Sequence, residues 1–131
     1  MPQHYLNQQQ LDTINALSAE QRYDEFVDKI IKWDAVCGLC SAQGWAVISD
    51  DGDEFLPVWY HTDLAAQWAT GGYSDCQPKT IPLNDWLGKW LPGMDNDNIM
   101  IVVCPDVEGE GIVVSAAELS EDLKRAINQQ P

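Results

Sequence analysis

Residues 44–60, GWAVISDDGDEFLPVWY, decide how this sequence folds. Two apolar runs, residues 45–49 and 55–60, flank the acidic turn DDGDE at residues 50–54. This pattern predicts two paired strands joined by a hairpin turn with solvated charge. A two-stranded ribbon is marginally stable in water, so the rest of the chain has to supply more strands or a covering helix.

Three further runs have the composition of strands. Residues 36–41 predict a strand before the hairpin, and residues 99–104 and 112–115 predict two strands after it, joined as a second hairpin through the loop PDVEGEG. The run 99–104 is apolar on both faces, which is typical of a central strand. Pro57 has no N–H for a ladder, so we expect its strand at an edge or with a bulge there. Residues 73–79 read as a loop.

Apolar spacing predicts helices between these strands. Ser18 and Gln21 form a capping-box pattern, and apolar residues repeat on one helical face behind them, which predicts a helix over residues 18–33. A shorter helix is expected around Leu11 and Ile14. Others are expected from Thr62 to Gly71-Gly72, from Asn84 or Asp85 to Pro92-Gly93, and after the cap Ser115. The residues expected on their inner faces are Tyr23, Phe26, Val27, Ile30, Ile31, Leu64, Ala65, Trp68, Ala69, Leu83, Trp86, Leu87, Trp90, Leu91, Leu119, Leu123, Ala126 and Ile127.

These elements predict an α+β fold with a mostly antiparallel sheet of about five strands and helices packed against it. The 131 residues are expected to form a single domain over 1–131, with residues 1–7 as a flexible tail. Neither a signal peptide nor a membrane-spanning run is visible, so we expect a cytoplasmic protein.

The charge is strongly negative, with 7 Lys and Arg against 21 Asp and Glu and a net charge of −14. Such a surface repels nucleic acid and anionic lipid headgroups and favours cationic partners. A self-repelling surface that only aids solubility is the alternative. Mimicry of nucleic-acid charge needs carboxylates gathered on one face, whereas these are spread along the chain.

The candidate metal and redox residues form no complete site. Cys37 and Cys40 have CxxC spacing, but on an extended strand they point to opposite faces. Cys76, Cys104, His4 and His61 stand singly, so two further zinc ligands are not evident. Residues 95–98, DNDN, depart from the EF-hand template at the third ligand and at the glycine. We therefore expect no metal and no cofactor.

Catalytic motifs are also missing: there is no GxSxG elbow and no Gly-rich phosphate loop. No residue is predicted to be catalytic. His61, just after a strand end, is the plausible general base by residue type. A small-molecule or hydrolytic enzyme with a pocket near His61 and Asp63 is therefore the alternative function.

Six Trp residues are available for a core or an interface. Trp45, Trp68, Trp86 and Trp90 are expected in the core, whereas Trp33 or Trp59 could lie in a groove. We predict a non-enzymatic accessory, inhibitor-like or immunity-like domain that binds a protein with a basic surface. Its oligomeric state is left open. The candidate binding residues lie together at the strand end: Trp59, Tyr60, His61 and Asp63.

The order of Trp and Pro landmarks carries a family resemblance. LSAEQRYDEFVDKIIKWDAVCGL, GWAV, FLPVWYHTDLAAQWA and IPLNDWLGKWLPGM, from about residue 17 to 119, resemble the bacterial family known as domain of unknown function 2750. The FLPVW segment is also similar to the strand-to-helix step of the SseB N-terminal domain. The resemblance supports the α+β reading and implies no activity or site residue.

Overall fold

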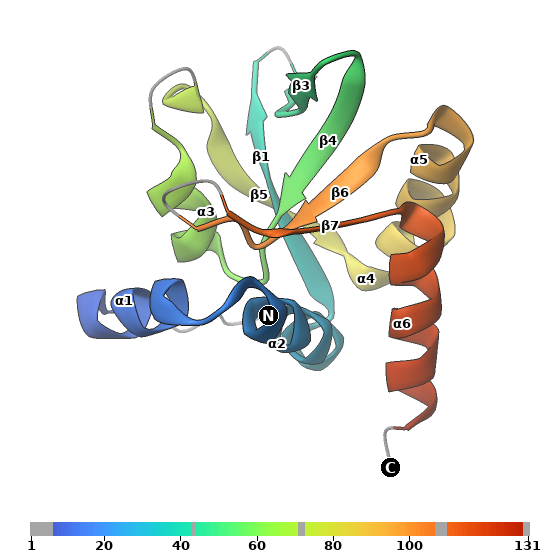
Figure 1. Cartoon of the computed structure of the whole chain (residues 1–131), viewed down its shortest axis with the longest axis horizontal. Coiled ribbons are helices and arrows are strands. Elements are labelled where there is room, and N and C mark those ends of the chain that lie inside the picture. The colour runs from blue at the N-terminus through green and yellow to red at the C-terminus, as the bar shows by residue number, and fades with distance from the viewer. Residues whose placement is uncertain (1–6, 43, 71–72, 107–109, 130–131) are drawn as a thin grey trace.

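The computed structural model describes residues 7–42, 44–70, 73–106 and 110–129. Along the chain it contains α1 (Gln8–Ala16), α2 (Ala19–Trp33), β1 (Ala35–Ser41), β2 (Gly44–Trp45), β3 (Ile48–Asp50), β4 (Asp53–Val58), α3 (Thr62–Trp68), β5 (Gln77–Pro82), α4 (Leu83–Asp85), a π-helical turn (Trp86–Trp90), α5 (Leu91–Asp97), β6 (Met100–Val103), β7 (Ile112–Val114) and α6 (Ala116–Asn128). The predicted α+β class is confirmed (Figure 1).

Within the described residues the strands form two sheets rather than one. A three-stranded antiparallel sheet has the order β2-β1-β5, and a four-stranded mixed sheet has the order β3-β4-β6-β7. In the mixed sheet β4 and β6 run parallel, while the other neighbours run antiparallel. Reciprocal backbone hydrogen bonds of 2.9 and 2.8 Å between Cys37 and Trp59 join the two sheets.

The predicted strand 45–49 is divided between the sheets. Trp45 pairs with Cys40 of β1, whereas Ile48 pairs with Phe55 of β4. The chain crosses from one sheet to the other between them, where Ala46 N–H donates to Leu39 O at 2.8 Å. The strand β5 was not predicted from the sequence. It lies at an edge of its sheet and contains two prolines, which is why its sequence reads as a loop.

The predicted acidic turn is confirmed as the connection between β3 and β4. Asp51 and Gly52 have φ angles of 52° and 85°. Positive φ at both central residues is the geometry of the two-residue type I′ turn, whose hand of twist matches that of paired strands. The hairpin stands at the upper edge of the molecule in Figure 1.

The expected edge position of the Pro57 strand is wrong, because β4 lies between β3 and β6. Its register with β6 is continuous from Phe55 to Val58, so the alternative of a bulge there is not found either. The carbonyl of Val58 accepts from Cys104 N–H at 2.7 Å, so the backbone polar groups of Val58 point towards β6. Those of the preceding residue, Pro57, point to the opposite side, towards β3. On that opposite side the β3 ladder ends at Phe55, and the bridge to β1 begins at Trp59. Pro57 therefore occupies the gap where no ladder bond is required.

The predicted helix 18–33 is confirmed as α2, with its Ser18–Gln21 capping box. It packs against β6, β7 and α6. Its buried stripe is Arg22, Phe26 and Ile30. The other predicted inner residues, Tyr23, Val27 and Ile31, are only half-buried, because α6 covers them incompletely.

The predicted helix end at Pro92-Gly93 is wrong. The helical segment begins at Leu83 and continues to Asp97, because the π-helical turn lets Leu91 N–H reach Trp86 O. Pro92 follows the π-helical turn directly, where the i→i−4 ladder is already interrupted, so a residue without an N–H is tolerated inside the helical segment.

The other helix ends are partly as predicted. Ser115 caps α6, as expected, but Ile127 on its last turn is 36 % exposed rather than inward. His61, not Thr62, is the N-cap of α3, which ends at Trp68. Residues 71–72, the predicted stop, lie outside the described residues. So do residues 1–6 of the predicted tail, while Asn7 caps α1.

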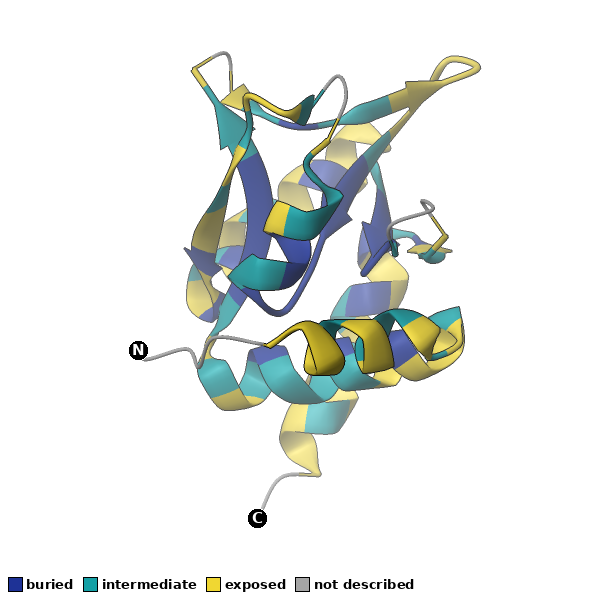
Figure 2. Ribbon diagram, turned by 90° about the vertical axis from the view of Figure 1, so that its left-hand side faces the viewer, coloured by how far each residue is buried: buried dark blue, intermediate teal, exposed yellow. Residues whose placement is uncertain are grey.

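Aromatic packing also differs from the prediction. Trp59 and Trp86 are fully buried, whereas Trp45, Trp68 and Trp90 are half-buried. The core lies between the sheets and their helices, as the burial colouring shows (Figure 2). Among the described helices, not one has the length and apolar character needed to cross a membrane.

Candidate functional site

The predicted binding residues at the end of β4 lie in the core. Trp59, Tyr60 and His61 are 1 %, 3 % and 1 % exposed. The Trp59 indole N–H donates to Pro105 O at 3.0 Å, and the ring packs 5.4 Å from Trp68. An anchor for a partner needs accessible surface. That Trp59 and Tyr60 bind a partner stays a prediction, and their burial beside the bridge to β1 does not favour it.

His61 and Asp63 do lie together. Asp63 N–H donates to His61 Nδ1 at 3.0 Å, and Asp63 Oδ2 is 3.8 Å from the same nitrogen. Trp33 packs edge-on against the His61 ring at 5.9 Å. The imidazole thus serves as the cap of α3, and the clefts described below are lined by other residues. A catalytic pocket at His61 and Asp63 stays a prediction.

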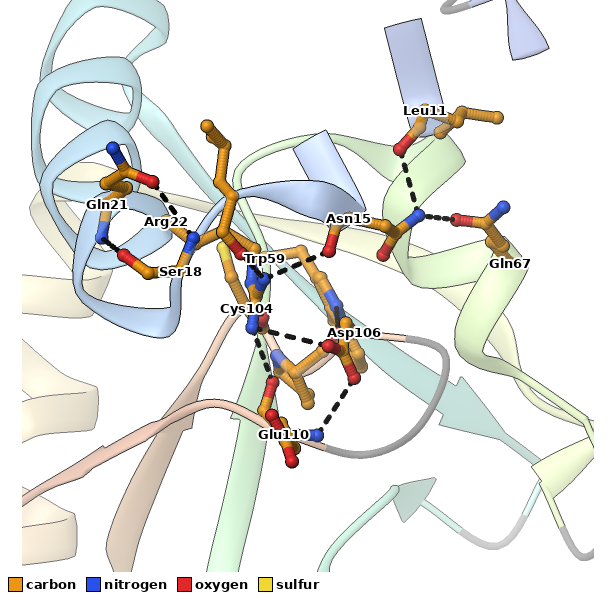
Figure 3. A network of polar contacts seen from close by, with 12 residues as sticks. Leu11, Asn15, Ser18, Gln21, Arg22, Trp59, Gln67, Cys104, Asp106 and Glu110 are labelled. Atoms are coloured by element: carbon orange, nitrogen blue, oxygen red, sulfur yellow. Dashed lines mark hydrogen bonds and ion pairs between the residues drawn. The ribbon is translucent and has the colours of Figure 1, made fainter. Parts of the chain in front are cut away.

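Arg22 is a buried polar centre that the sequence analysis missed (Figure 3). It is 3 % exposed and binds carbonyls from both ends of the β6–β7 connection, with Nε donating to Cys104 O at 3.0 Å and Nη2 to Glu110 O at 2.8 Å. Its Nη1 donates to Leu17 O, and Nη2 lies 3.6 Å from Asp106 Oδ2. Its sequence signal is the spacing to Phe26 and Ile30, which share its buried stripe. With its donors engaged by the protein, Arg22 holds the fold together.

The thiols do not form a metal centre among the described residues. Cys37 and Cys40 lie on the extended strand β1, with Cys37 buried and Cys40 half-buried. Burial raises the pKa of the Cys37 thiol to about 12, and burial also raises the pKa of Cys104. Neutral thiols are poor nucleophiles and poor metal ligands. The absence of a metal and of a cofactor remains a prediction.

A groove runs between α2 and α6, with a volume of about 500 Å³. Val27, Ile31 and Ala126 supply its apolar lining. Its charged groups are largely paired: Asp28 lies 3.2 Å from Lys32, and Asp122 lies 3.2 Å from Arg125. Tyr23 O–H also donates to Asp122 across the groove. This groove consequently offers a partner little uncompensated charge.

A smaller groove of about 370 Å³ lies on the other side of α6, against α5. Leu87, Leu91 and Ala116 supply its apolar lining, and charged residues of both signs, Asp95, Glu121 and Lys124, lie along it. It too lacks a concentration of one charge.

The turn between β3 and β4 gathers four carboxylates that form no ion pair among the described residues. Asp50, Asp51, Asp53 and Glu54 are all exposed. The ion pairs of the described residues lie elsewhere, on Asp28, Asp63, Asp85, Asp106 and Asp122. Lys29 and Lys79 form no ion pair with a carboxylate of the described residues. Their ammonium groups lie over indole rings instead, Lys29 at 5.6 Å from Trp33 and Lys79 at 5.7 Å from Trp45.

Asp50 and Asp53 are direct cross-strand partners. Like charges placed opposite each other on neighbouring strands destabilise a hairpin. The hairpin therefore concentrates four carboxylates on five residues at a cost in stability, and a cation placed beside them would offset that cost.

The fold and this hairpin define a small α+β domain with an acidic, uncompensated turn. The chain belongs to the family described as protein of unknown function (DUF2750), which matches residues 23–123. The predicted family resemblance is thereby confirmed, and no curated protein matches the chain. The similarity to the SseB N-terminal domain stays a prediction.

Proposed function

We propose that this protein is a non-enzymatic, cytoplasmic accessory domain, inhibitor-like or immunity-like, that binds a partner protein with a basic surface. The observation that carries the proposal is the turn at residues 50–54, with four exposed carboxylates and no ion pair among the described residues. A net charge of −14 extends the same field over the molecule.

The physical basis is electrostatic steering. A basic surface is attracted to the turn before contact. Once bound, a Lys or Arg of the partner lies between Asp50 and Asp53 and attracts both, which offsets their mutual repulsion. Salt shortens the Debye length from about 30 Å at 0.01 M to about 8 Å at 0.15 M, so the steering has to weaken over that range. The phosphates of duplex DNA are repelled by the same field.

The test begins with partners captured from the native host and identified by mass spectrometry. Their surface charge is then examined, and the association rate with the purified partner is measured at increasing salt. We expect a basic partner whose association rate falls about tenfold or more between 0.01 and 0.15 M salt. An acidic or neutral partner, a salt-independent rate, or tight binding of plain duplex DNA at 0.15 M salt would contradict the proposal.

A matched pair of triple variants locates the effect. The turn variant combines Asp50→Asn, Asp53→Asn and Glu54→Gln. The control variant combines Asp95→Asn, Asp97→Asn and Glu121→Gln, which removes the same three charges from exposed helical positions. The turn variant should slow association and flatten its salt dependence more than the control. Equal effects would mean that net charge, and not the turn, attracts the partner.

A further inference from the structure

The strand register of the mixed sheet places six apolar side chains on one side. Residues paired in a ladder point to the same side of a sheet, and residues two apart on a strand do likewise. Ile48 pairs with Phe55, and Phe55 with Met100. Pro57 pairs with Val102, and Val102 with Val113. These two rows form what we call the outer face: Ile48, Phe55, Pro57, Met100, Val102 and Val113.

The opposite side of the same sheet is closed. There Leu56, Val58, Ile101 and Val103 are buried in the core, and α2 packs against β6 and β7. On the outer face Ile48, Phe55 and Met100 are partly exposed and Val113 is 48 % exposed, whereas Pro57 and Val102 between them are buried. Strands that are apolar on both faces are typical of sheets whose two faces are both covered. The outer face is therefore a surface that a partner can cover.

The charge beside this face specifies the partner. Asp50 and Asp53 are the next pair along the hairpin on the same side as Ile48 and Phe55, because they lie two residues away on each strand. The apolar rows thus end in two unpaired carboxylates. A covering element needs apolar side chains over the rows and a Lys or Arg over this pair. A second copy of the chain has no Lys or Arg among the outer-face residues, so it would leave these two carboxylates unpaired.

The dimensions of the face favour a helix. Four strands about 4.8 Å apart span about 14 Å, and an α-helix with side chains is about 10–12 Å across. We propose that the outer face binds an amphipathic helix of the partner, with its apolar side on the two rows and a basic residue at Asp50 and Asp53. This inference rests on the function proposed above and assigns its surface.

The test uses a synthetic peptide of about 18 residues, long enough for five helical turns. Its leucines recur on one helical side and its lysines occupy the other, and a scrambled peptide of the same composition is the reference. Dissociation constants are compared for the unmodified protein, for Val113→Lys and for Ile127→Lys. Val113 and Ile127 are the large apolar side chains that are exposed among the described residues, so both variants add one charge at an exposed site.

We expect Val113→Lys to weaken binding of the amphipathic peptide about tenfold or more, a change of about 1.4 kcal/mol, and Ile127→Lys to change it less than about twofold. Circular dichroism checks that both variants fold. Amide chemical shifts of the unmodified protein give a second measurement, and the changes should gather on β3, β4, β6 and β7. Equal losses in both variants, shifts gathered on the α2–α6 groove, or dimerisation through the outer face would overturn this inference.

The two proposals fail separately. Suppose that the basic partner binds in a salt-dependent way and that Val113→Lys and Ile127→Lys weaken its binding equally. The outer face would then not be the docking surface, while the proposed function would still hold. Partners that are not basic, or salt-independent association, would remove the proposed function itself. Equal binding of the amphipathic and scrambled peptides would show attraction by charge without a helical docking site, and would also overturn the inference.

Discussion

Arg22 Nε donates a 3.0 Å hydrogen bond to the carbonyl of Cys104, a residue 82 positions away along the chain. Cys104 has a φ of 48°, a left-handed conformation that is uncommon outside glycine. The guanidinium also binds Glu110 O, so it closes the connection that follows β6. The turn before α2 and the end of the central strand are held by a single side chain.

Arg22→Met should therefore destabilise the protein by about 3–5 kcal/mol, because it leaves the carbonyls of Leu17, Cys104 and Glu110 without this donor and removes the ion pair with Asp106. Arg22→Lys should also be costly, since an ammonium lacks the planar fork that reaches these acceptors. Urea unfolding measures both. Arg125→Met, which removes an exposed ion pair, is the control and should cost about 0.2–1 kcal/mol. Equal losses at the two sites would refute the central role of Arg22.

Asp53→Asn should stabilise the free protein by about 0.2–1 kcal/mol, because it removes one of two like charges that face each other across the hairpin. The free energy of unfolding from urea titration at low salt is the measurement. Glu121→Gln, an exposed carboxylate on α6, is the control. If Asp53→Asn destabilises the protein, the two carboxylates are not in uncompensated repulsion.

Trp86→Ala should cost more stability than Trp90→Ala. Trp86 is fully buried, so its truncation leaves a cavity and should lower the free energy of unfolding by about 3–5 kcal/mol. Trp90 is half-buried and contributes mainly through its edge contact with Trp45 at 4.8 Å and its stacking on Trp86 at 6.1 Å, each worth about 0.5–1.5 kcal/mol. Thermal and urea unfolding of both variants decide the order, and a larger loss at Trp90 would reverse the assignment.

The four thiols should react in two classes with a disulfide reagent at mildly alkaline pH. Cys40 and Cys76 are half-buried and should react in the native state, whereas the buried Cys37 and Cys104 should react only after unfolding. The released chromophore counts reacted thiols with and without denaturant. Four thiols of similar native reactivity would mean that the region around β1 and β6 opens readily.

Stability should decline at alkaline pH partly through Cys37. Burial raises its pKa from 9.0 to about 12 in the folded state. The unfolded chain loses this proton above about pH 9 while the folded protein keeps it. The contribution of Cys37 to the free energy of unfolding therefore falls as pH rises from about 9 towards 12. Cys37→Ala should flatten the pH dependence of the unfolding free energy over that window. An unchanged slope would contradict the assigned cause.

Local patterns determined much of the fold from sequence alone. The α2 helix and its capping box, the Asp-Gly turn, the central strand β6 and its hairpin with β7 all follow from spacing and turn chemistry within a few residues. The acidic character of the turn was also evident, because exposed charge at a hairpin tip needs no partner in the fold.

Tertiary structure alone decided which apolar residues are accessible. Trp59 and Phe55 both belong to one apolar strand, and sequence cannot tell them apart. Trp59 is enclosed because the strand end meets β1 through the Cys37 bridge, while Phe55 lies where the sheet is less covered. Arg22 shares the spacing of Phe26 and Ile30, but only the carbonyls of distant segments that accept its hydrogen bonds account for a buried charge there. Burial depends on contacts between residues far apart in the chain, and local periodicity does not contain them.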